Sequence, residues 1–335
     1  MIYAPVLIPT LNRDRHLERC LNSLMKNSVA QETEVYVSVD FPPNEKYVEG
    51  YERVKKVLEK DYSGFKKLYV IYQKRNLGAG KNIDFLREYV AKSYDRFIAT
   101  EDDNEFSENF LEYIDKGLDM FKEDSSIIGI CGFRDTQWVN NGSNVVKSKL
   151  FSPYGYGAWF EKNQNYQIEG EKLLLSKEIM KPSKMVFLLK KNPMLFSIYI
   201  SNLICTNEGL YWNEDGTIRW ADSIRSIYMH FTDTCCVVPV ECKSRTWGND
   251  GSGLNMKKIE GLNPEKQWKL DTDCGFEYDI KKTFEFDKRN YKIGKEYLKV
   301  KEINRLVISA LIKYVLLLLC RYDRQKVIKI IEKMH

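Results

Sequence analysis

The chain has 335 residues, of which 43% are hydrophobic, 13% aromatic and 30% charged, with a formal net charge of +5. This apolar content excludes an intrinsically disordered chain, and no uncharged apolar stretch reaches the about 20 residues of an ordinary membrane span. Residues 288–335 hold 13 Lys/Arg and 4 Asp/Glu, a net charge of +9 that leaves −4 for the rest.

Strands and helices alternate along the first 131 residues. Short apolar or β-branched runs predict strands at residues 5–8, 35–39, 68–72, 96–100 and 127–131. Between them, apolar residues recur at helical spacing around 17–24, 47–58, 83–90 and 110–118. This alternation predicts an α/β fold with a mainly parallel, Rossmann-like central sheet and helices on both faces. Ligands of such sheets bind at the carboxyl ends of the strands, so the polar residues there are the candidates.

Polar residues follow the first four predicted strands. They are Pro9, Thr10 and Arg13, then Asp40, then Asn76, Gly78 and Lys81, and finally Glu101, Asp102 and Asp103. Three successive carboxylates repel one another unless a cation is present, and hard oxygen ligands suit Mg²⁺ or Mn²⁺ bridging substrate phosphates. Two plainer interpretations stay open, in which Asp40 is a turn residue and the acidic run caps a helix starting near Ser107.

The order of these clusters resembles that of nucleotide-sugar-dependent glycosyltransferases with the GT-A fold, of the large bacterial family-2 kind. The acidic run is similar to that of N-acetylglucosaminyltransferase I, and so are three later segments in the same order, at 154–159, 220–225 and 239–253. The likeness covers roughly residues 3–255. One departure is Ala221, because that family has Asp at the position before the one that Asp222 matches.

The resemblance implies an inverting, metal-dependent glycosyltransferase. Sugar would pass from a nucleotide-diphospho-sugar, with a UDP-sugar favoured, to a glycan or polyprenyl-linked acceptor in bacterial surface polysaccharide assembly. By position, Asp103 would hold Mn²⁺ or Mg²⁺, and Asp222 would be the general base. Asp40 would accept a hydrogen bond from the nucleotide base, and Arg13 would lie near the phosphates or the base.

The same resemblance implies a larger donor site. Glu101 and Asp102 would contact the ribose and the sugar, and the segment 244–253 would order over the bound donor. The other implied donor-site residues are Pro9, Thr10, Asn76, Gly78, Lys81, Arg245 and Ser252. For Asp222, an ordinary N-cap of a helix at 223–231 stays open as the alternative.

Aromatic residues are frequent in the middle third of the chain. Sugars pack their C–H faces on aromatic planes, so we expect the motif residues Tyr156, Trp159, Trp220 and Trp247 to form walls of the acceptor site. The plainer alternative for each of them is core packing.

Two other functional classes stay open. A nucleotidyltransferase acting on sugar phosphates would place a glycine-rich loop directly after the first strand, but residues 10–17 contain no glycine. A non-catalytic sugar-nucleotide-binding module would need no base opposite a metal ion. The charge balance does not favour nucleic acid as a partner, because the excess of positive charge is confined to the C-terminal segment.

We therefore predict a catalytic domain at 1–285, with a donor half at 1–131 and an acceptor half at 132–285, followed by a basic helical region at 286–335. Within that region, 306–320 is an apolar run with one charge, flanked by Lys and Arg. It fits a helix in an anionic membrane interface, a helix packed on the domain, or a dimer contact.

The eight cysteines form no C-x-x-C pair and no signal peptide is recognisable. We therefore expect a cytoplasmic protein, for which peripheral contact at the inner membrane face stays open.

Overall fold

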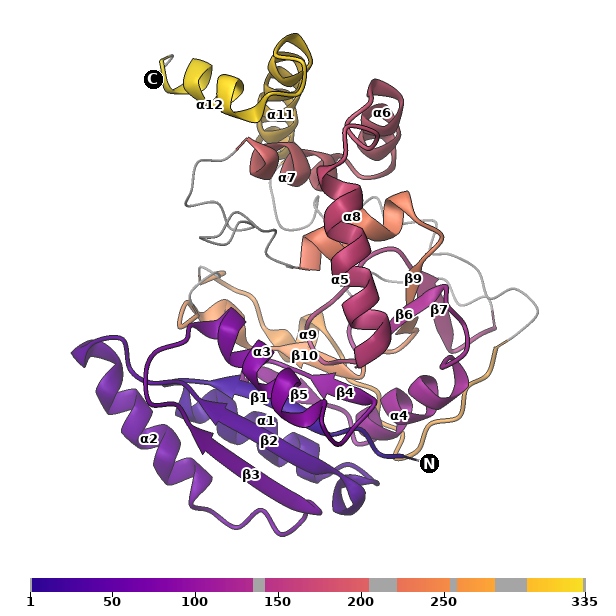
Figure 1. The fold of residues 1–335 in the computed structure, drawn as a ribbon. Coiled ribbons are helices and arrows are strands. Elements are labelled where there is room, and N and C mark those ends of the chain that lie inside the picture. The colour runs from indigo at the N-terminus through magenta and orange to yellow at the C-terminus, as the bar shows by residue number, and fades with distance from the viewer. Residues whose placement is uncertain (1, 135–141, 205–221, 254–257, 281–299, 334–335) are drawn as a thin grey trace. The chain divides into compact units, whose positions relative to one another are not determined.

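The computed structural model describes residues 2–134, 142–204, 222–253, 258–280 and 300–333 (Figure 1). The chain forms two compact units. The sheet unit comprises Met1–Lys147, Ser152–Asn163 and Cys236–Glu285, and the helical unit comprises Ser148–Phe151, Gln164–Cys235 and Phe286–His335. This division differs from the predicted domains, because residues 164–235 group with the C-terminal helices rather than with the sheet.

The sheet unit is built on an eight-stranded sheet of order β3-β2-β1-β4-β8-β6-β9-β7. The strands are β1 (Val6–Thr10), β2 (Glu34–Val39), β3 (Lys67–Tyr72), β4 (Arg96–Ala99), β6 (Ile127–Cys131), β7 (Val145–Ser148), β8 (Tyr156–Trp159) and β9 (Cys235–Pro239). Strand β1 runs parallel to β2 and β4, β2 runs parallel to β3, and β8 is antiparallel to both β4 and β6. All five predicted strands and the mainly parallel α/β plan are confirmed.

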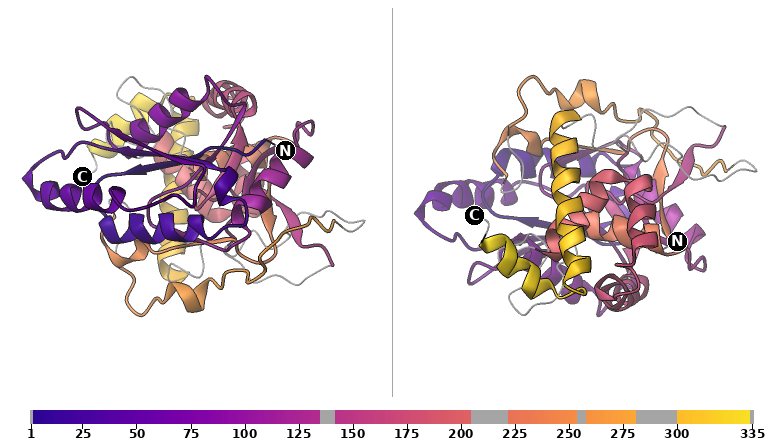
Figure 2. Two further views of the ribbon diagram at one scale, coloured as in Figure 1. Left: turned by 90° about the horizontal axis from the view of Figure 1, so that it is seen from below. Right: turned by 90° about the horizontal axis from the view of Figure 1, so that it is seen from above.

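Helices cover both faces of the first strands. They are α1 (Asp14–Met25), α2 (Val48–Leu58), α3 (Ala79–Val90) and α4 (Phe110–Met120). The connections β1–α1–β2 and β2–α2–β3 step across the sheet in one direction and β3–α3–β4 returns, so right-handed crossovers place α3 on the face opposite α1. Figures 1 and 2 show α1 and α3 on opposite sides of the strands. Helix α1 turns Leu17, Cys20, Leu21 and Leu24 into the core.

A second sheet has two strands, of which the first follows β4 in the chain and the second comes from a distant segment. Its strands β5 (Asn104–Phe106) and β10 (Ser244–Thr246) are antiparallel, and Thr246 pairs with Asn104. The short helices η1 (Ala30–Glu32), η2 (Glu45–Tyr47), η3 (Gly248–Asp250) and α9 (Pro264–Gln267) complete the sheet unit. This small ribbon brings the segment 244–250 to the acidic run, which ends at residue 103.

The helical unit has an apolar core of its own. Its helices are α6 (Pro182–Lys191), α7 (Pro193–Leu203), α8 (Asp222–Phe231), α11 (Val300–Leu319) and α12 (Arg324–Glu332), and the unit boundary falls within α5 (Phe160–Leu175). Pro193 and the Asn192 side chain, which accepts a hydrogen bond from the Leu195 N–H, start α7. Helix α7 contacts both α6 and α11.

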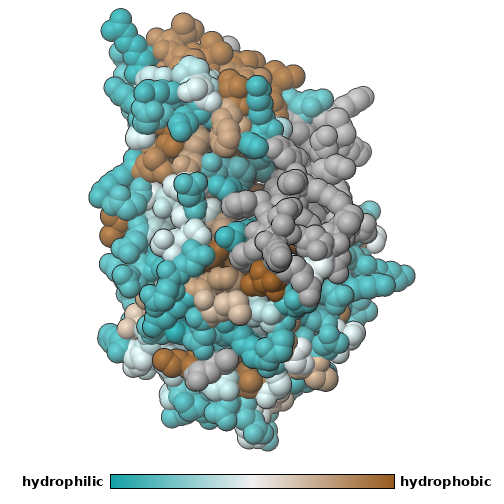
Figure 3. Space-filling view, turned by 90° about the vertical axis from the view of Figure 1, so that its right-hand side faces the viewer, coloured by the Kyte–Doolittle hydropathy of each residue, from teal (hydrophilic) through white to brown (hydrophobic). Residues whose placement is uncertain are grey.

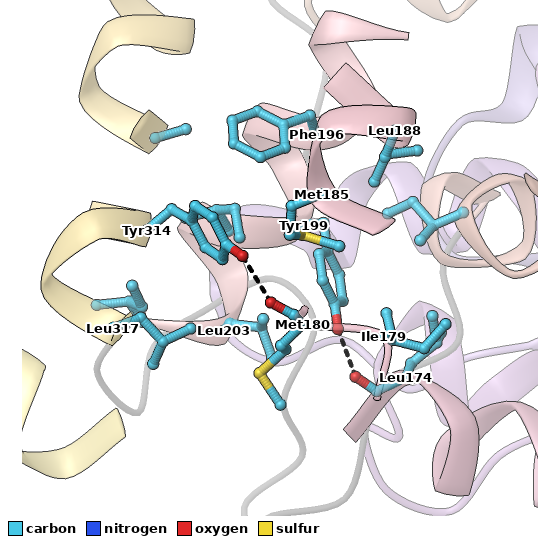
Figure 4. Packing of buried hydrophobic residues seen from close by; sticks show 14 of the residues in the cluster. Leu174, Ile179, Met180, Met185, Leu188, Phe196, Tyr199, Leu203, Tyr314 and Leu317 are labelled. Atoms are coloured by element: carbon cyan, nitrogen blue, oxygen red, sulfur yellow. Dashed lines mark hydrogen bonds between the residues drawn. The ribbon is translucent and has the colours of Figure 1, made fainter. Parts of the chain in front are cut away.

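Two tyrosines tie that core together. Tyr314 on α11 donates a hydrogen bond of 2.7 Å to the carbonyl of Met180, and Tyr199 on α7 donates one of 2.5 Å to the carbonyl of Leu174 (Figure 4). One face of the predicted C-terminal helix therefore packs within the helical unit. Among the described residues, none of the helices combines the length and the hydrophobicity needed to cross a bilayer.

Candidate active site

The carboxyl ends of β1 and β4 bring the acidic run beside Thr10. These strands are parallel neighbours, and the Thr10 hydroxyl donates a hydrogen bond of 2.7 Å to Oδ2 of Asp102. Asp102 and Asp103 are 2% and 4% exposed, whereas Glu101 is exposed. The acidic run does not cap a helix, because β5 follows it and α4 begins only at Phe110. That alternative from the sequence is wrong.

Arg13 forms ion pairs with both buried carboxylates, and its single positive charge balances one of their two negative charges. Its guanidinium forms ion pairs with Asp102 and, at 2.6 Å, with Oδ2 of Asp103. Burial alone lowers the pKa of Arg13, but the charges of the two aspartates outweigh it, and the pKa lies above its ordinary value. Burial raises the pKa of Asp102 and the charge of Asp103 adds to this, while Arg13 and Thr10 oppose the rise. The site therefore requires positive charge, and Arg13 supplies it.

Asp103 keeps one carboxylate oxygen for a further partner. Its Oδ1 is buried and makes no hydrogen bond, while its Oδ2 contacts Arg13. Among the residues that the structure describes, no three His, Cys, Asp or Glu side chains gather to form a metal cage. One carboxylate oxygen fits Mg²⁺ or Mn²⁺, because these ions keep several waters and take other ligands from substrate phosphates.

The segment after β10 closes against the acidic run. The Trp247 N–H donates a hydrogen bond of 2.8 Å to the carbonyl of Asp103. A Cβ atom at Gly248 would lie 2.4 Å from Oδ2 of Asp103, so only glycine fits there. Gly248 therefore lies where the backbone passes close to the buried carboxylate of Asp103.

Two residues of α1, which the sequence analysis missed, also contact this segment. His16 Nε2 lies 2.9 Å from Oδ2 of Asp250 and 3.3 Å from the Ser252 hydroxyl oxygen. The Arg19 guanidinium lies 4.0 Å above the Trp247 ring, a cation–π contact. We call these contacts of His16 and Arg19 with residues 247–252 the α1 clasp.

A local signal for the α1 clasp was present in the sequence. Arg13, His16 and Arg19 follow one another at intervals of three residues, which places three polar side chains near one face of α1.

Asp250 is also held within its own segment. The Ser252 N–H donates a hydrogen bond of 2.9 Å to Oδ1 of Asp250. Although burial raises the pKa of Asp250, its contacts with Ser252 and His16 hold the pKa below its ordinary value.

Glu105 fixes two of the predicted site residues. Its Oε2 accepts hydrogen bonds from the Arg245 Nε at 2.8 Å and from the Trp247 indole N–H at 2.7 Å. Both side chains are partly exposed beside the acidic run. Their predicted contacts, of Arg245 with the donor and of Trp247 with the acceptor, stay predictions.

Asp40 holds the loop after β3. Its two oxygens accept hydrogen bonds from the N–H groups of Phe41, Leu77 and Gly78 and from the side-chain amide of Asn76. Four donors fill the acceptor sites of one carboxylate, so the turn-residue interpretation describes what Asp40 does here. Gly78 adopts φ +76°, which favours glycine. A contact of Asp40 with a nucleotide base would have to replace one of these four donors, and it stays a prediction.

The remaining predicted donor-site residues lie at the same sheet edge. Pro9 belongs to β1 and is partly exposed, and Lys81 lies exposed in the first turn of α3. The predicted contacts of Pro9 and Lys81 with a bound donor stay predictions.

Two predicted acceptor-site aromatics belong to the core instead. Tyr156 and Trp159 on β8 are 4% and 3% exposed. The Tyr156 hydroxyl accepts a hydrogen bond of 2.6 Å from Arg87, and the Trp159 indole N–H donates one of 3.2 Å to the carbonyl of Leu118. Side chains covered on all sides cannot form the wall of an open site, so the core-packing alternative replaces our interpretation.

The predicted base belongs to the helical unit. Asp222 is the first residue of α8, and it is exposed. Trp220 lies outside the residues that the structure describes. The structure thus brings together Thr10, Arg13, Asp102, Asp103, Trp247 and Ser252, and it assigns Asp222 to the other unit.

Comparison with known proteins gives distant likenesses only. No family model matches the chain, and no curated protein matches it. Among solved structures, S. aureus TarS in complex with UDP is 19% identical over 44% of this chain and 35% of its own, with a TM-score of 0.30. The mannosyltransferase PcManGT from Pyrobaculum calidifontis, in complex with GDP-Man and Mn²⁺, is 12% identical over 48% and 45%, with a TM-score of 0.36.

HddC from Yersinia pseudotuberculosis is 12% identical over 48% of this chain and 77% of its own, with a TM-score of 0.28. The chain spans less than half of the length of the first two proteins. Likenesses of this level carry no information about chemistry. The function therefore has to be argued from the residues at the edge of the sheet.

Proposed function

We propose that the protein is an inverting, metal-dependent glycosyltransferase. It transfers a sugar from a nucleotide-diphospho-sugar, with a UDP-sugar favoured, to a glycan or polyprenyl-linked acceptor in bacterial surface polysaccharide assembly. The observation that carries the proposal is the buried pair Asp102 and Asp103, which both pair with the single positive charge of Arg13, with one Asp103 oxygen left without a hydrogen bond. Such a site suits a ligand that brings a divalent cation and phosphates together.

Residues of the sheet unit would bind the donor. Asp103 would hold Mn²⁺ or Mg²⁺, and the bound ion would neutralise the charge that develops on the leaving diphosphate. Arg13 would keep positive charge beside that diphosphate, and Glu101 and Asp102 would orient the ribose and the sugar. Asp40 would keep the loop after β3, with Asn76 and Gly78, in position beside the base.

The 244–253 segment would cover the donor. It is anchored at Trp247 to the carbonyl of Asp103 and at Asp250 and Ser252 to His16. Excluding water from this edge would strengthen every electrostatic contact with the diphosphate. The α1 clasp would therefore contribute mainly to donor binding.

Asp222 would act on the acceptor. An exposed carboxylate can take the proton from an acceptor hydroxyl, and general-base catalysis of this kind contributes about 10²–10⁴ to a rate. A single displacement with one base inverts the anomeric carbon, and no second carboxylate is needed as a nucleophile.

The test of this role is Asp222→Asn. We expect turnover of the nucleotide sugar to fall by about 10²–10⁴ while UDP binding is unchanged, because the amide cannot accept the proton. Asp233→Asn, at an exposed position just after α8, is the matched control and should keep full turnover. Full activity of Asp222→Asn would exclude the role as base.

A nucleotidyltransferase would give a different product. Incubation with a nucleoside triphosphate and a sugar 1-phosphate should release no pyrophosphate if the protein transfers sugars. Release of pyrophosphate, without release of a nucleoside diphosphate from any nucleotide sugar, would replace our proposal. Binding of UDP with neither reaction would indicate a non-catalytic module.

A further inference from the structure

Helix α11 has two apolar faces. The inner face packs Ala310, Tyr314 and Leu317, none more than 7% exposed, into the core of the helical unit. On the opposite side, Ile308, Ile312, Val315 and Leu319 are between 52% and 74% exposed. Their intervals of four, three and four residues form one stripe over three helical turns. We call it the α11 stripe.

A second group of exposed apolar side chains lies on α6. Val186 and Phe187 are 46% and 40% exposed, while Met185 and Leu188 of the same helix are buried. Because α6 and α11 both pack on α7, the two helices that carry these groups share one core (Figure 2, right). Figure 3 shows apolar surface gathered over the helices at the top of Figure 1. Apolar patches of this extent commonly mark an interaction surface.

Basic residues outnumber acidic ones on the helices that carry these groups. Between residues 304 and 333 the basic residues are Arg305, Lys313, Arg321, Arg324, Lys326, Lys329 and Lys333, and the acidic ones are Asp323 and Glu332. On α6, Lys184, Lys190 and Lys191 accompany the exposed Val186 and Phe187. Two copies meeting through this surface would place like charges together, whereas an anionic lipid surface offers the opposite charge.

We propose that the α11 stripe, with Val186 and Phe187, lies in the interface of an anionic bilayer. The helices would rest in the plane of the membrane, with the apolar side chains in the acyl boundary and the lysines and arginines at the phosphate level. The proposal rests on the helical unit alone and is independent of the reaction. A protein that acts on a polyprenyl-linked acceptor would gain from such docking.

The experiment is vesicle co-sedimentation of the full chain. Vesicles of an equimolar mixture of phosphatidylcholine and phosphatidylglycerol should retain the protein, vesicles of phosphatidylcholine alone should retain little, and added salt should release it. Ile312→Asp should weaken retention by at least about ten-fold, because it removes a branched apolar side chain that would enter the acyl boundary and adds a charge that anionic lipid repels.

The matched control is Met120→Asp. Met120 is 53% exposed on α4 of the sheet unit, so this variant adds the same charge at an equally exposed apolar position and should bind like the wild type. Ile312→Ser removes the apolar contact without adding charge and should also weaken retention. Unchanged melting temperatures would show that each variant is folded.

Three results would overturn the proposal. One is failure of the wild type to bind the anionic vesicles, and another is equal loss for Ile312→Asp and Met120→Asp. The third is a concentration-dependent dimer in light scattering that Ile312→Asp abolishes, without vesicle binding by the wild type. That last result would assign the α11 stripe to a second copy of the chain.

Discussion

The sheet unit and the helical unit each keep one kind of group in an unfavourable environment. The sheet unit buries Asp102 and Asp103, which are stable there only because Arg13 lies against them. The helical unit does the reverse, and leaves the apolar side chains of the α11 stripe in contact with water. The first arrangement suits a cation and phosphates, and the second suits lipid. One chain therefore points to two ligands of different chemistry.

Removing the positive charge of Arg13 from the acidic run should have the largest effect on stability. Arg13→Ala leaves two buried carboxylates uncompensated, and we expect it to lower the free energy of unfolding by about 3–5 kcal/mol. Mn²⁺ should restore part of this loss, because the ion replaces the missing charge. Urea unfolding with and without Mn²⁺ measures both effects.

The helical unit supplies the matched control. Leu317→Ala opens a cavity in its core and should cost about 2–5 kcal/mol. Mn²⁺ should not restore that loss, since no carboxylate is involved. If Mn²⁺ stabilised both variants equally, the ion would not be acting at Asp103, and the contrast between the units would fail.

Asp115 tests what burial does to an acid of the sheet unit that has no ion-pair partner among the described residues. Burial raises its pKa to about 7, although the Ala4 N–H and Arg96 oppose the rise. As pH rises above about 4, Asp115 ionises in the unfolded chain but stays protonated in the folded protein. The free energy of unfolding therefore falls as pH rises, until Asp115 also ionises in the folded protein at about pH 7.

Asp115→Asn should therefore be more stable than the wild type at pH 8, by at most about 4 kcal/mol, and should have no advantage near pH 4. Asp61→Asn is the control with the opposite sign, because the Ser63 N–H lowers the pKa of Asp61 and that variant should lose stability at pH 8. Urea unfolding at the two pH values distinguishes them. A gain for Asp115→Asn that is the same at both would contradict the account.

The α1 clasp should give the smallest effect. His16→Ala removes the contacts with Asp250 and Ser252 and should raise the donor KM by about three- to ten-fold, which corresponds to about 1 kcal/mol, with kcat little changed. Arg15→Ala, at the exposed neighbouring position of α1, should leave the donor KM unchanged. A fall in kcat with a constant KM would place His16 in the chemical step instead.

Much of the sheet unit could be predicted from local patterns. Alternation of β-branched runs with helical spacing gave five strands in the right places. Strands β1, β2, β4 and β6 are largely buried, so their apolar character is continuous, and the partly exposed edge strand β3 is still rich in aromatic and β-branched residues. The position of the acidic run at the edge of the sheet followed from the same topology. In the first 131 residues, the hydrophobic spacing along the chain and the observed strands and helices therefore agree.

The remaining features depend on contacts between distant residues. The residues next to Arg13 in the sequence do not predict that its guanidinium pairs with carboxylates 89 and 90 residues further along the chain. Trp159 matched a motif, but its burial is decided by the position of β8 between β4 and β6. The grouping of 164–235 with the C-terminal helices depends likewise on packing of α7 against α11.

Release of a nucleoside diphosphate from a panel of nucleotide sugars tests the central claim most directly. The assay would contain Mn²⁺ and a membrane lipid extract as the source of acceptor, and would compare the wild type with Asp103→Asn and with Asp84→Asn, an exposed control on α3. We predict that at least one donor, UDP-linked by preference, is turned over by the wild type and by Asp84→Asn, and at least about 10²-fold more slowly by Asp103→Asn. Turnover by Asp103→Asn at the wild-type rate, or release from none of the donors, would contradict the assignment of this sheet edge to nucleotide-sugar chemistry.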